Sequence, residues 1–375
     1  MAHVEDRWKA EPERRRTGRR WRVRYRDAAH RHHSRSFDRQ VDADRFAREV
    51  GRDLDLGTYI DPNAGRITFS AYAARWLANA NNLRETTFVS YEAIIRNHLD
   101  PMLGATPIAH LRPDDFHELI RHRRAAGSSD GTIRKIVRLA KTILANAVSD
   151  RLVAINPVDS VRLPKEAERE VRFLTAGQLA ELVAATHPHY RTLVLTAGIT
   201  GARSGELRGL HPRSLNLLRN EMHIVEQLVE VRGELKVLSP KTKASVRRLA
   251  LPRFLVAELE RQLSERSTTE LVFPTPTGDP IRKSNFTRRI WKPAVEASGL
   301  GYLTFHELRH TAVALAIEVG AHPKAIQERF GHSSITVTLD RYGHLFPSLD
   351  EALADNFDRS FGETLAPPAR PETAG

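Results

Sequence analysis

Cysteine is absent from the 375-residue sequence. This absence excludes disulfide bonds, thiolate metal sites and a cysteine nucleophile, and it agrees with a reducing compartment. No segment approaches the roughly 18 consecutive apolar residues that a membrane span needs. The first residues, MAHVEDRWKAEPERRR, also lack the apolar stretch of a secretory signal. We therefore expect a cytoplasmic protein, nucleoid-associated if it binds DNA, with no membrane partner.

Acidic residues are outnumbered by basic ones, so that the formal net charge is +12. Such a balance indicates a polyanionic partner, and nucleic acid fits better than a membrane surface because no basic amphipathic helix or lipidation signal is present. A basic protein that binds nothing acidic remains the alternative at this point. Hydrophobic residues make up 41% of the chain, which is enough for a buried core.

Residues 1–60 form the most basic segment. Within RRWRVRYRD, arginines alternate with apolar residues, which predicts a strand with one apolar face and one arginine face. SRSF is the expected partner strand, and DADRFAREVGRDL is expected to form a short helix. A small sheet with a basic face suits a DNA backbone or groove, and a solvated basic tail is the alternative. The candidate DNA-binding residues of this face are Arg20, Arg22 and Arg24.

Residues 66–161 have the apolar periodicity of four helices. Pro113 suits the first position of the third helix, and Gly127 suits its end. The fourth helix, DGTIRKIVRLAKTILANAVSDRL, carries apolar residues on one side and basic residues mostly off that side. These basic residues, which are further candidates for DNA binding, are Arg134, Lys135, Arg138 and Lys141.

Residues 172–362 are predicted to be mainly helical with one β interruption, in which Gly233 and the polar stretch PKTKAS mark turns. The tail, residues 363–375, has the composition of a disordered segment. The whole chain is therefore expected to be mainly α with small β elements (α+β). It would consist of a small N-terminal sheet-and-helix domain, a helical domain and a mixed domain with β-hairpins.

Two short stretches of the last segment have residues suited to phosphate chemistry. Arg203, in TAGITGARSGELRGL, follows a glycine-containing turn at a predicted helix start, where amides and an arginine together suit a phosphate. Lys241 and Lys243 share one turn in a chain with ten lysines and forty-eight arginines. A lysine can release a proton near neutral pH when its pKa is lowered, whereas arginine effectively cannot. Taken singly, each residue is more simply explained as a solvated surface side chain.

The stretch QERFGHSSITVTLDRYGH adds His332 and Tyr342. Tyr342 lies beside Asp340, Arg341 and His344, and this polar setting predicts an exposed hydroxyl that is available for activation. His332 precedes serines suited to cap a helix. Either residue alone would more often be structural than catalytic.

The stretch LTFHELRHTAVALA permits two interpretations. His306, Glu307 and His310 satisfy the zinc-protease pattern H-E-x-x-H. Alternatively, His306 and Arg309 lie one turn apart and face a phosphate. A cation on nearly the same helix face as both imidazoles disfavours a bound dication. The zinc interpretation also needs a third ligand, for which the candidates are Glu318, His322, Glu328 and His332.

Four local sequences occur in a fixed order: TGARSGEL, SPKTKAS, FHELRHTAVALA and FGHSSITVTLDRYGH. Together they resemble the tyrosine recombinase (phage integrase) family, and the resemblance covers about residues 172 to 350. The helical segment is similar to the core-site-binding domain of that family. The basic first segment is loosely similar to the arm-site-binding domain of lambda-type integrases.

The resemblance implies a site-specific DNA recombinase that integrates or excises a mobile element through a 3′-phosphotyrosine. It assigns the nucleophile to Tyr342 and supporting orientation of an arginine to Glu206. It implies no metal, no cofactor and no ATP, and the sequence has no P-loop. The catalytic set that it implies is Arg203, Lys241, His306, Arg309, His332 and Tyr342.

The implied partners are double-stranded DNA with attachment sites and three further copies of the chain in a tetramer on DNA. A directionality factor or a host DNA-bending protein is a candidate accessory partner. The alternatives are a zinc hydrolase, a type IB topoisomerase-like enzyme that relaxes DNA, and a DNA-binding protein of this fold without catalysis. The separate basic first segment favours integration over relaxation, because it suggests a second kind of DNA site.

Overall fold

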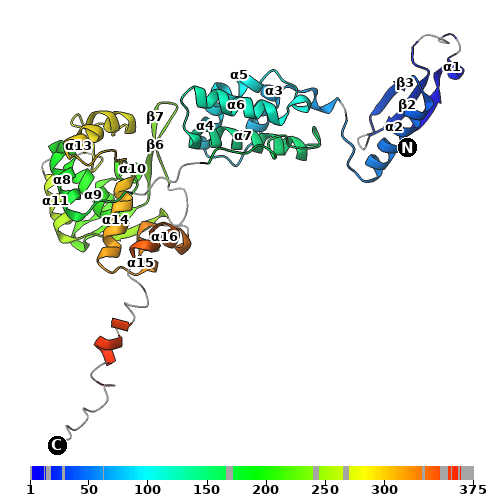
Figure 1. The fold of residues 1–375 in the computed structure, drawn as a ribbon. Coiled ribbons are helices and arrows are strands. Elements are labelled where there is room, and N and C mark those ends of the chain that lie inside the picture. Colours follow the sequence, from blue (N-terminus) through cyan, green and yellow to red (C-terminus); the bar gives the residue numbers. More distant parts are fainter. Residues whose placement is uncertain are drawn as a thin grey trace, which may run out of the picture. The chain divides into compact units, whose positions relative to one another are not determined.

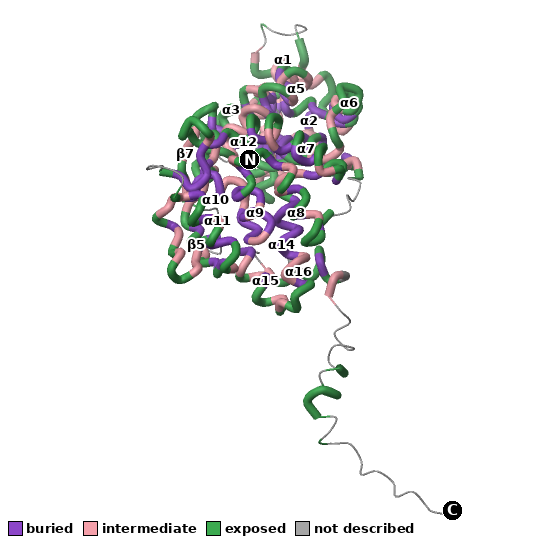
Figure 2. Tube along the Cα trace, turned by 90° about the vertical axis from the view of Figure 1, so that its left-hand side faces the viewer, coloured by how far each residue is buried: buried purple, intermediate pink, exposed green. Residues whose placement is uncertain are grey.

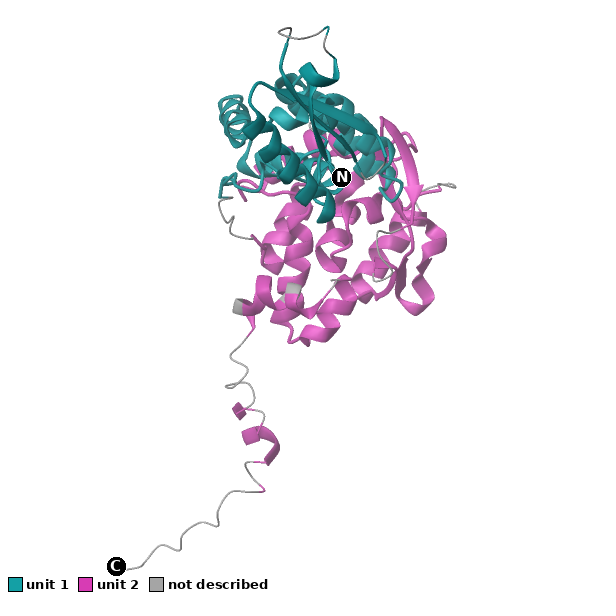
Figure 3. Cartoon of the chain, turned by 90° about the vertical axis from the view of Figure 1, so that its right-hand side faces the viewer, with its two compact units in different colours: residues 1–168 teal, residues 169–375 magenta. Residues whose placement is uncertain are grey.

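The computed structural model of the chain describes residues 2–11, 13, 18–27, 30–61, 63–165, 172–239, 245–264, 270–331, 334–346, 354, 355, 357–361 and 364. The chain divides into two compact units, residues 1–168 and residues 169–375 (Figure 3). The predicted boundaries at 1–60, 66–161 and 172–362 stay predictions. The predicted disordered tail, 363–375, lies outside the described residues except for Thr364.

The first unit begins with a three-stranded antiparallel sheet and a helix (Figure 1). Its elements are β1 (His3–Asp6), α1 (Arg7–Ala10), β2 (Trp21–Arg26), β3 (His32–Phe37) and α2 (Gln40–Asp55). The central strand β2 pairs with both neighbours, and its alternation buries Val23 and Tyr25 against Ala43 and Val50 of α2. The strand predicted from the alternating pattern, its predicted partner strand and the predicted helix are thereby confirmed.

The rest of the first unit is helical. Its elements are η2 (Ala64–Arg66), α3 (Phe69–Ala78), α4 (Glu85–Ile94), the π turn η3 (Ile95–Leu99), α5 (Asp100–Leu103), η4 (Ile108–His110), α6 (Pro113–Ala125) and α7 (Asp130–Ser149). Pro113 lies in the first turn of α6, and Gly127 follows its end with a positive φ of 77°, as predicted. The Ser129 hydroxyl caps α7 by accepting a hydrogen bond from the Thr132 amide, and the apolar side of α7 is buried in the helical core.

The second unit is mainly helical with two small sheets. Its helices are α8 (Ala176–Ala185), η5 (Pro188–Tyr190), α9 (Arg191–Thr200), α10 (Ser204–Arg208), η6 (Pro212–Ser214), η7 (Leu217–Arg219), α11 (Arg253–Ser264), α12 (Lys283–Phe286), the π turn η9 (Thr287–Trp291), α13 (Lys292–Ala297), α14 (Glu307–Glu318), α15 (Pro323–Phe330), α16 (Ile335–Tyr342) and η10 (Gly343–Leu345). Its strands are β4 (Leu215–Asn216), β5 (Glu221–Ile224), β6 (Gln227–Val231), β7 (Glu234–Leu238) and β8 (Arg247–Ala250). The α+β fold class predicted from the sequence is confirmed.

The β interruption of the second unit consists of the antiparallel sheet β4-β5-β8 and the hairpin β6-β7. Gly233 makes the predicted hairpin turn with φ +82°. The turn predicted at PKTKAS, residues 240–245, lies outside the described residues apart from Ser245.

Helices α9 and α14 pack on each other inside the second unit, and both are largely buried (Figure 2). The main core of this unit surrounds them, and a smaller cluster joins α14 to α15 and α16. This smaller cluster consists of Ala312, Val313, Ile317, Ile326, Phe330 and Tyr342. Arg309 of α14 and Tyr342 of α16 therefore belong to helices that pack in these clusters. None of the helices formed by the described residues has the length and apolar character needed to span a bilayer.

Candidate active site

Arg203 and Glu206 are fixed by the end of α9 and the start of α10. Helix α9 ends at Thr200, and the next residue, Gly201, has a left-handed φ of +60°. A Cβ at this position would lie 2.5 Å from Cε1 of Phe330, so that glycine is required by both conformation and space. Arg203 then precedes α10, and its amide donates to Oε2 of Glu206 at 2.8 Å. Nη1 of Arg203 donates to Oε1 of the same carboxylate, also at 2.8 Å.

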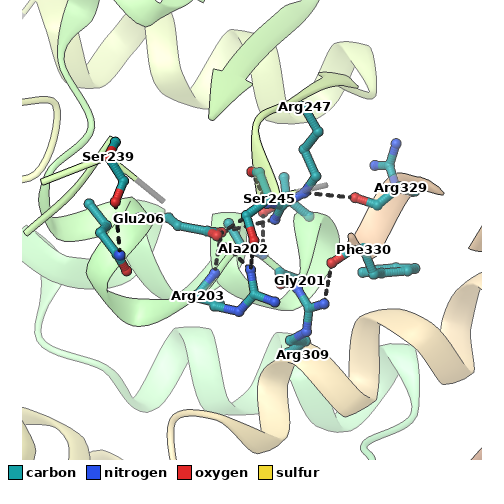
Figure 4. Close-up of polar contacts among 12 residues, drawn as sticks. Gly201, Ala202, Arg203, Glu206, Ser239, Ser245, Arg247, Arg309, Arg329 and Phe330 are labelled. Carbon is teal, nitrogen blue, oxygen red and sulfur yellow. Dashed lines mark hydrogen bonds and ion pairs between the residues drawn. The ribbon is translucent and has the colours of Figure 1, made fainter. Parts of the chain in front are cut away.

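Glu206 also binds a second arginine, Arg247 of β8 (Figure 4). Nη1 and Nη2 of Arg247 donate to the two carboxylate oxygens at 3.1 and 2.9 Å. Glu206 is only 2% exposed. Burial alone favours its neutral form, but the hydrogen bonds and charge of Arg247, together with Arg203, hold the pKa of Glu206 below its ordinary value. The carboxylate therefore stays ionised and fixes both guanidinium groups.

Arg247 connects three separate segments of the site. Besides Glu206, it donates to the backbone oxygen of Arg329, at the end of α15, at 2.9 Å and to that of Ser245 at 3.0 Å. Sequence reasoning missed this residue. A signal was present, because the stretch SVRRLAL alternates exposed and inward positions, and Arg247 occupies an inward position in line with Leu249 and Leu251. An arginine on the inward side of a strand requires a partner.

Arg309 lies in the first turn of α14 and is 6% exposed. Its Nη1 donates to the backbone oxygen of Gly201 at 2.8 Å, and its Nη2 donates to that of Phe330. Burial and the neighbouring cations Arg203 and Arg247 lower the pKa of Arg309 to about 9, so it remains a cation at neutral pH. A guanidinium has five N–H groups, and the two carbonyls leave others for an anion.

His306 immediately precedes α14, one turn before Arg309, as the spacing predicted. Unlike Arg309, His306 is exposed. It borders a cavity of about 760 Å³ together with Ser204, Lys283 and Tyr302. Partial desolvation and the cations Arg309 and Arg203 lower the pKa of His306, so its imidazole is neutral at neutral pH.

Tyr342 lies at the end of α16 and is only 2% exposed, so the prediction of an exposed hydroxyl is wrong. The reason is tertiary packing: the ring belongs to the apolar cluster that includes Ile326 and Phe330. Its hydroxyl is hydrogen-bonded to Nδ1 of His310. Burial raises the pKa of Tyr342, and the charges of Arg341 and Arg309 oppose that effect.

In the structure, residues that the zinc interpretation of H-E-x-x-H would use as ligands or as the base have protein partners instead. Nδ1 of His310 is bound to Tyr342, and the buried Glu307 carboxylate accepts a hydrogen bond from the Thr304 amide. His322, a candidate third ligand, accepts from the Lys324 amide at the start of α15. Among the residues that the structure describes, no three histidine, aspartate or glutamate side chains are grouped to hold a metal ion.

Three of the predicted site residues lie outside the described residues: Lys241, its alternative Lys243, and His332. Their described neighbours border the site. Ser245, just after the lysine turn, has its hydroxyl 3.5 Å from Nη1 of Arg203. Phe330, two residues before His332, binds Arg309 through its carbonyl.

The predicted DNA-binding residues differ in their surroundings. Arg20 pairs with Asp6, Arg22 with Glu5 and Glu11, and Arg24 with Glu5. Arg134 donates to the carbonyl of Pro164 at 2.8 Å, and Lys141 lies 3.0 Å from Asp159. Lys135 and Arg138 are exposed on α7. The role of all seven residues in DNA binding stays a prediction.

Comparison with known proteins identifies two family regions in the chain. The model described as "Phage integrase family" matches residues 172–348, and "Phage integrase, N-terminal SAM-like domain" matches residues 68–122. A curated relative, the ICEBs1 integrase of Bacillus subtilis, is 25% identical over 306 residues, which span 78% of this chain and 83% of the relative.

Solved structures of two integrases have the same fold. The Tn1549 transposon integrase in complex with a circular intermediate DNA is 21% identical, with a TM-score of 0.67 and coverage of 78% of this chain and 100% of that one. A lambda integrase tetramer bound to a Holliday junction is 20% identical, with a TM-score of 0.55 and coverage of 84% and 94%. The chain therefore belongs to the phage integrase family and is a tyrosine recombinase, an enzyme of site-specific recombination that cleaves and rejoins DNA.

Proposed function

We propose that Tyr342 attacks a phosphodiester of DNA and forms a 3′-phosphotyrosine with release of a free 5′-hydroxyl. The covalent intermediate conserves the energy of the broken bond, so a second 5′-hydroxyl can rejoin the strand without ATP. In this way the enzyme would integrate or excise a mobile element between two attachment sites.

The observation that supports this proposal is an excess of positive charge around Arg309, a cation that also acts on Tyr342. In the described part of this network, Arg203 and Arg247 are hydrogen-bonded to the Glu206 carboxylate, and all three groups act electrostatically on Arg309. Burial, and then repulsion from Arg203 and Arg247, lower the pKa of Arg309 although Glu206 opposes them, so the site is short of negative charge. A bound phosphate supplies that charge, and the charge grows further in the pentacoordinate transition state. Preorganised cations of this kind stabilise the transition state more than the ground state.

Each polar residue has a proposed role in this reaction. Arg203 and Arg309 bind the non-bridging oxygens, and Glu206 orients Arg203 as it does in the structure. His306, which opens on the cavity, acts as a general acid or base at the phosphate. From their position in the sequence, Lys241 protonates the 5′-oxygen, with Lys243 as its alternative, and His332 hydrogen-bonds the scissile phosphate.

The partners follow from the same proposal. The helical segment, residues 66–161, would bind core sites through Lys135, Arg138 and their neighbours, and the basic residues 1–60 would bind arm sites. Because lambda integrase forms a tetramer on a Holliday junction, we propose a tetramer of this chain on two duplexes. A directionality factor or a host DNA-bending protein would select the direction, and the reaction would take place on the nucleoid in the cytoplasm.

A nicked suicide substrate tests the nucleophile. The duplexes span the ends of the mobile element that carries the gene, and a covalent protein–DNA adduct is measured on a denaturing gel. Tyr342→Phe should form no adduct. Tyr72→Phe is the matched control, because it removes another buried hydroxyl, one that binds Asp150 at 2.8 Å in the first unit. An adduct that survives in Tyr342→Phe would refute the assignment of Tyr342.

A further inference from the structure

The hydroxyl of Tyr342 is held by His310, a residue to which the proposed mechanism gives no role. Nδ1 of His310 and the Tyr342 hydroxyl are hydrogen-bonded, and the two ring centroids are 5.8 Å apart. Both side chains are buried, at 9% and 2% exposure. His310 belongs to α14 and Tyr342 to α16, so tertiary packing brings them together. The contact involves the oxygen that would attack the phosphate.

The charges around His310 keep its imidazole neutral. Burial, together with the facing groups His306, Arg341 and Arg309, lowers the pKa of His310 to about 4, although Glu307 opposes them. Above that pH the ring is neutral, and it has one nitrogen that donates and one that accepts. With the phenol as donor, Nδ1 is the acceptor and the proton of the ring is on Nε2. His310 is therefore in the protonation state that a proton acceptor needs.

His306 and His310 face different parts of the site. Their rings are in edge-to-face contact, with centroids 5.3 Å apart. His306 is exposed and borders the cavity beside Ser204 and Lys283, where a substrate has access. His310 is on the inner side, against the nucleophile. His306 and His310, one helix turn apart, therefore have different surroundings: His306 faces the cavity open to substrate, and His310 contacts Tyr342.

We infer that His310, and not His306, accepts the proton of Tyr342 during strand cleavage, as a further catalytic residue of this site. The inference rests on the proposed role of Tyr342 as nucleophile. In the step, the bond between Tyr342 Oη and phosphorus forms and the bond from phosphorus to the 5′-oxygen breaks. The phenolic proton passes to Nδ1 of His310, and the 5′-oxygen receives a proton from the acid proposed at Lys241. Rejoining is the reverse of these transfers.

Bound DNA raises the pKa of His310 and so makes it a better base. In the free protein, burial and then the ring of His306 and the cations Arg341 and Arg309 hold the pKa of His310 low. A phosphate bound to Arg203 and Arg309 adds negative charge to this region, and nearby negative charge favours the protonated imidazole. The basicity of His310 therefore rises when the substrate is in place. The free enzyme, by contrast, keeps Tyr342 protonated and inactive.

The test is the single-turnover rate of adduct formation by the full-length protein at several pH values. His310→Ala should lower the rate at neutral pH by about 10²- to 10⁴-fold, the range for loss of a general base. Its rate should rise about tenfold per pH unit toward alkaline pH, because hydroxide then ionises Tyr342. His310→Asn, whose Oδ1 can keep the hydrogen bond to the Tyr342 hydroxyl but cannot take up its proton, should be as slow as His310→Ala at neutral pH and should show the same alkaline rise.

A second substrate distinguishes a defect in the deprotonation of Tyr342 from a defect in the protonation of the leaving 5′-oxygen. In a 5′-bridging phosphorothiolate the leaving thiolate needs no proton, so variants of the leaving-group acid recover. His310 variants should stay slow on this substrate. The inference would be overturned by a wild-type rate in His310→Ala or by recovery of that variant on the phosphorothiolate. It would also be overturned if His306→Ala recovered at alkaline pH and His310→Ala did not.

Two controls keep the experiment decisive. Thermal unfolding of each variant shows that it is folded, and where His310→Ala is unfolded, the rate of His310→Asn decides. A wild-type rate in His310→Asn would contradict proton uptake by His310, because an amide is not a base at neutral pH. Tyr342→Phe is run in parallel: an adduct there refutes the proposed nucleophile itself, which distinguishes that failure from a failure of His310.

Discussion

Replacing Arg247 with alanine should damage the second unit more than any surface change on the same strand. Arg247 makes two hydrogen bonds to the Glu206 carboxylate and two to backbone oxygens. The side chains of Arg247 and Glu206 are 5% and 2% exposed, so water cannot replace the lost partner. The variant leaves a buried carboxylate with Arg203 as its remaining guanidinium in this network.

The expected cost follows from the burial of the pair. Removing one partner of a buried ion pair typically costs about 3–5 kcal/mol, because the other charge stays in the interior. For a unit of this size, each kcal/mol shifts the melting temperature by roughly 2–4 °C, so the expected loss is roughly 6–20 °C. Cleavage should fall as well, since Glu206, without its hydrogen bonds to Arg247, fixes the orientation of Arg203 less firmly.

The loss of stability in Arg247→Ala should be larger at neutral pH than at acidic pH. In the wild type, the pKa of Glu206 is lowered, so its stabilising effect is present above the pKa of the unfolded chain and disappears as the pH falls through the folded value. In Arg247→Ala, burial favours the neutral acid, and protonation relieves the penalty. The difference in stability between the two proteins should therefore be greatest near pH 7 and shrink toward pH 4.

The assay is differential scanning calorimetry of the full-length protein at both pH values, followed through the transition of the second unit. Arg248→Ala is the matched control, because Arg248 is the next residue of the strand, is 66% exposed and lies 3.5 Å from Glu221. Such an exposed pair contributes less than about 1 kcal/mol. The reasoning is refuted if Arg247→Ala costs no more than Arg248→Ala, or if its cost does not change with pH.

Two further predictions concern the backbone of the site and the DNA surface. Gly201→Ala should destabilise the protein by about 1–3 kcal/mol and slow cleavage, because its Cβ meets Phe330 and its carbonyl holds Arg309. Gly233→Ala, with a positive φ but open space around it, should cost less and leave cleavage intact in the same unfolding and adduct assays; equal effects would contradict the packing argument. Lys135→Ala with Arg138→Ala should reduce the slope of log affinity against log salt by about 1 per residue, measured by fluorescence anisotropy on a core site. Lys141→Ala should change the slope less because Lys141 already pairs with Asp159, and an unchanged slope in the double variant would exclude α7 as a phosphate-binding face.

Local periodicity predicted the secondary structure well, for physical reasons that are visible in individual elements. Helix α7 has apolar residues three and four apart and a capping serine, and these features operate within one helix. The alternation of β2 and the positive φ of Gly233 are equally local. The turn before Arg203 and the one-turn spacing of His306 and Arg309 are also local features. Such features depend on neighbours in sequence, so the sequence contains them directly.

Contacts between distant residues were harder to predict. Glu206 meets Arg247 across 41 positions, and Arg309 meets Gly201 across 108. Nothing in the local pattern of SVRRLAL identifies the carboxylate that Arg247 will bind, although its inward position indicates that it must bind something. The exposure of Tyr342 was predicted from its polar neighbours in sequence and was wrong, because Ile326 and Phe330 of another helix cover its ring.

The sequence by itself determined the kind of chemistry: a cysteine-free basic chain with arginines, histidines and a tyrosine in the order of a tyrosine recombinase. It also determined that His306 and Arg309 share one helix turn, because helix geometry fixes that spacing. Only the tertiary structure decided that Arg247 completes the charge network and that His310 holds the hydroxyl of Tyr342. The reason is that burial and pairing depend on which helices and strands pack together, and that packing is a property of the whole fold.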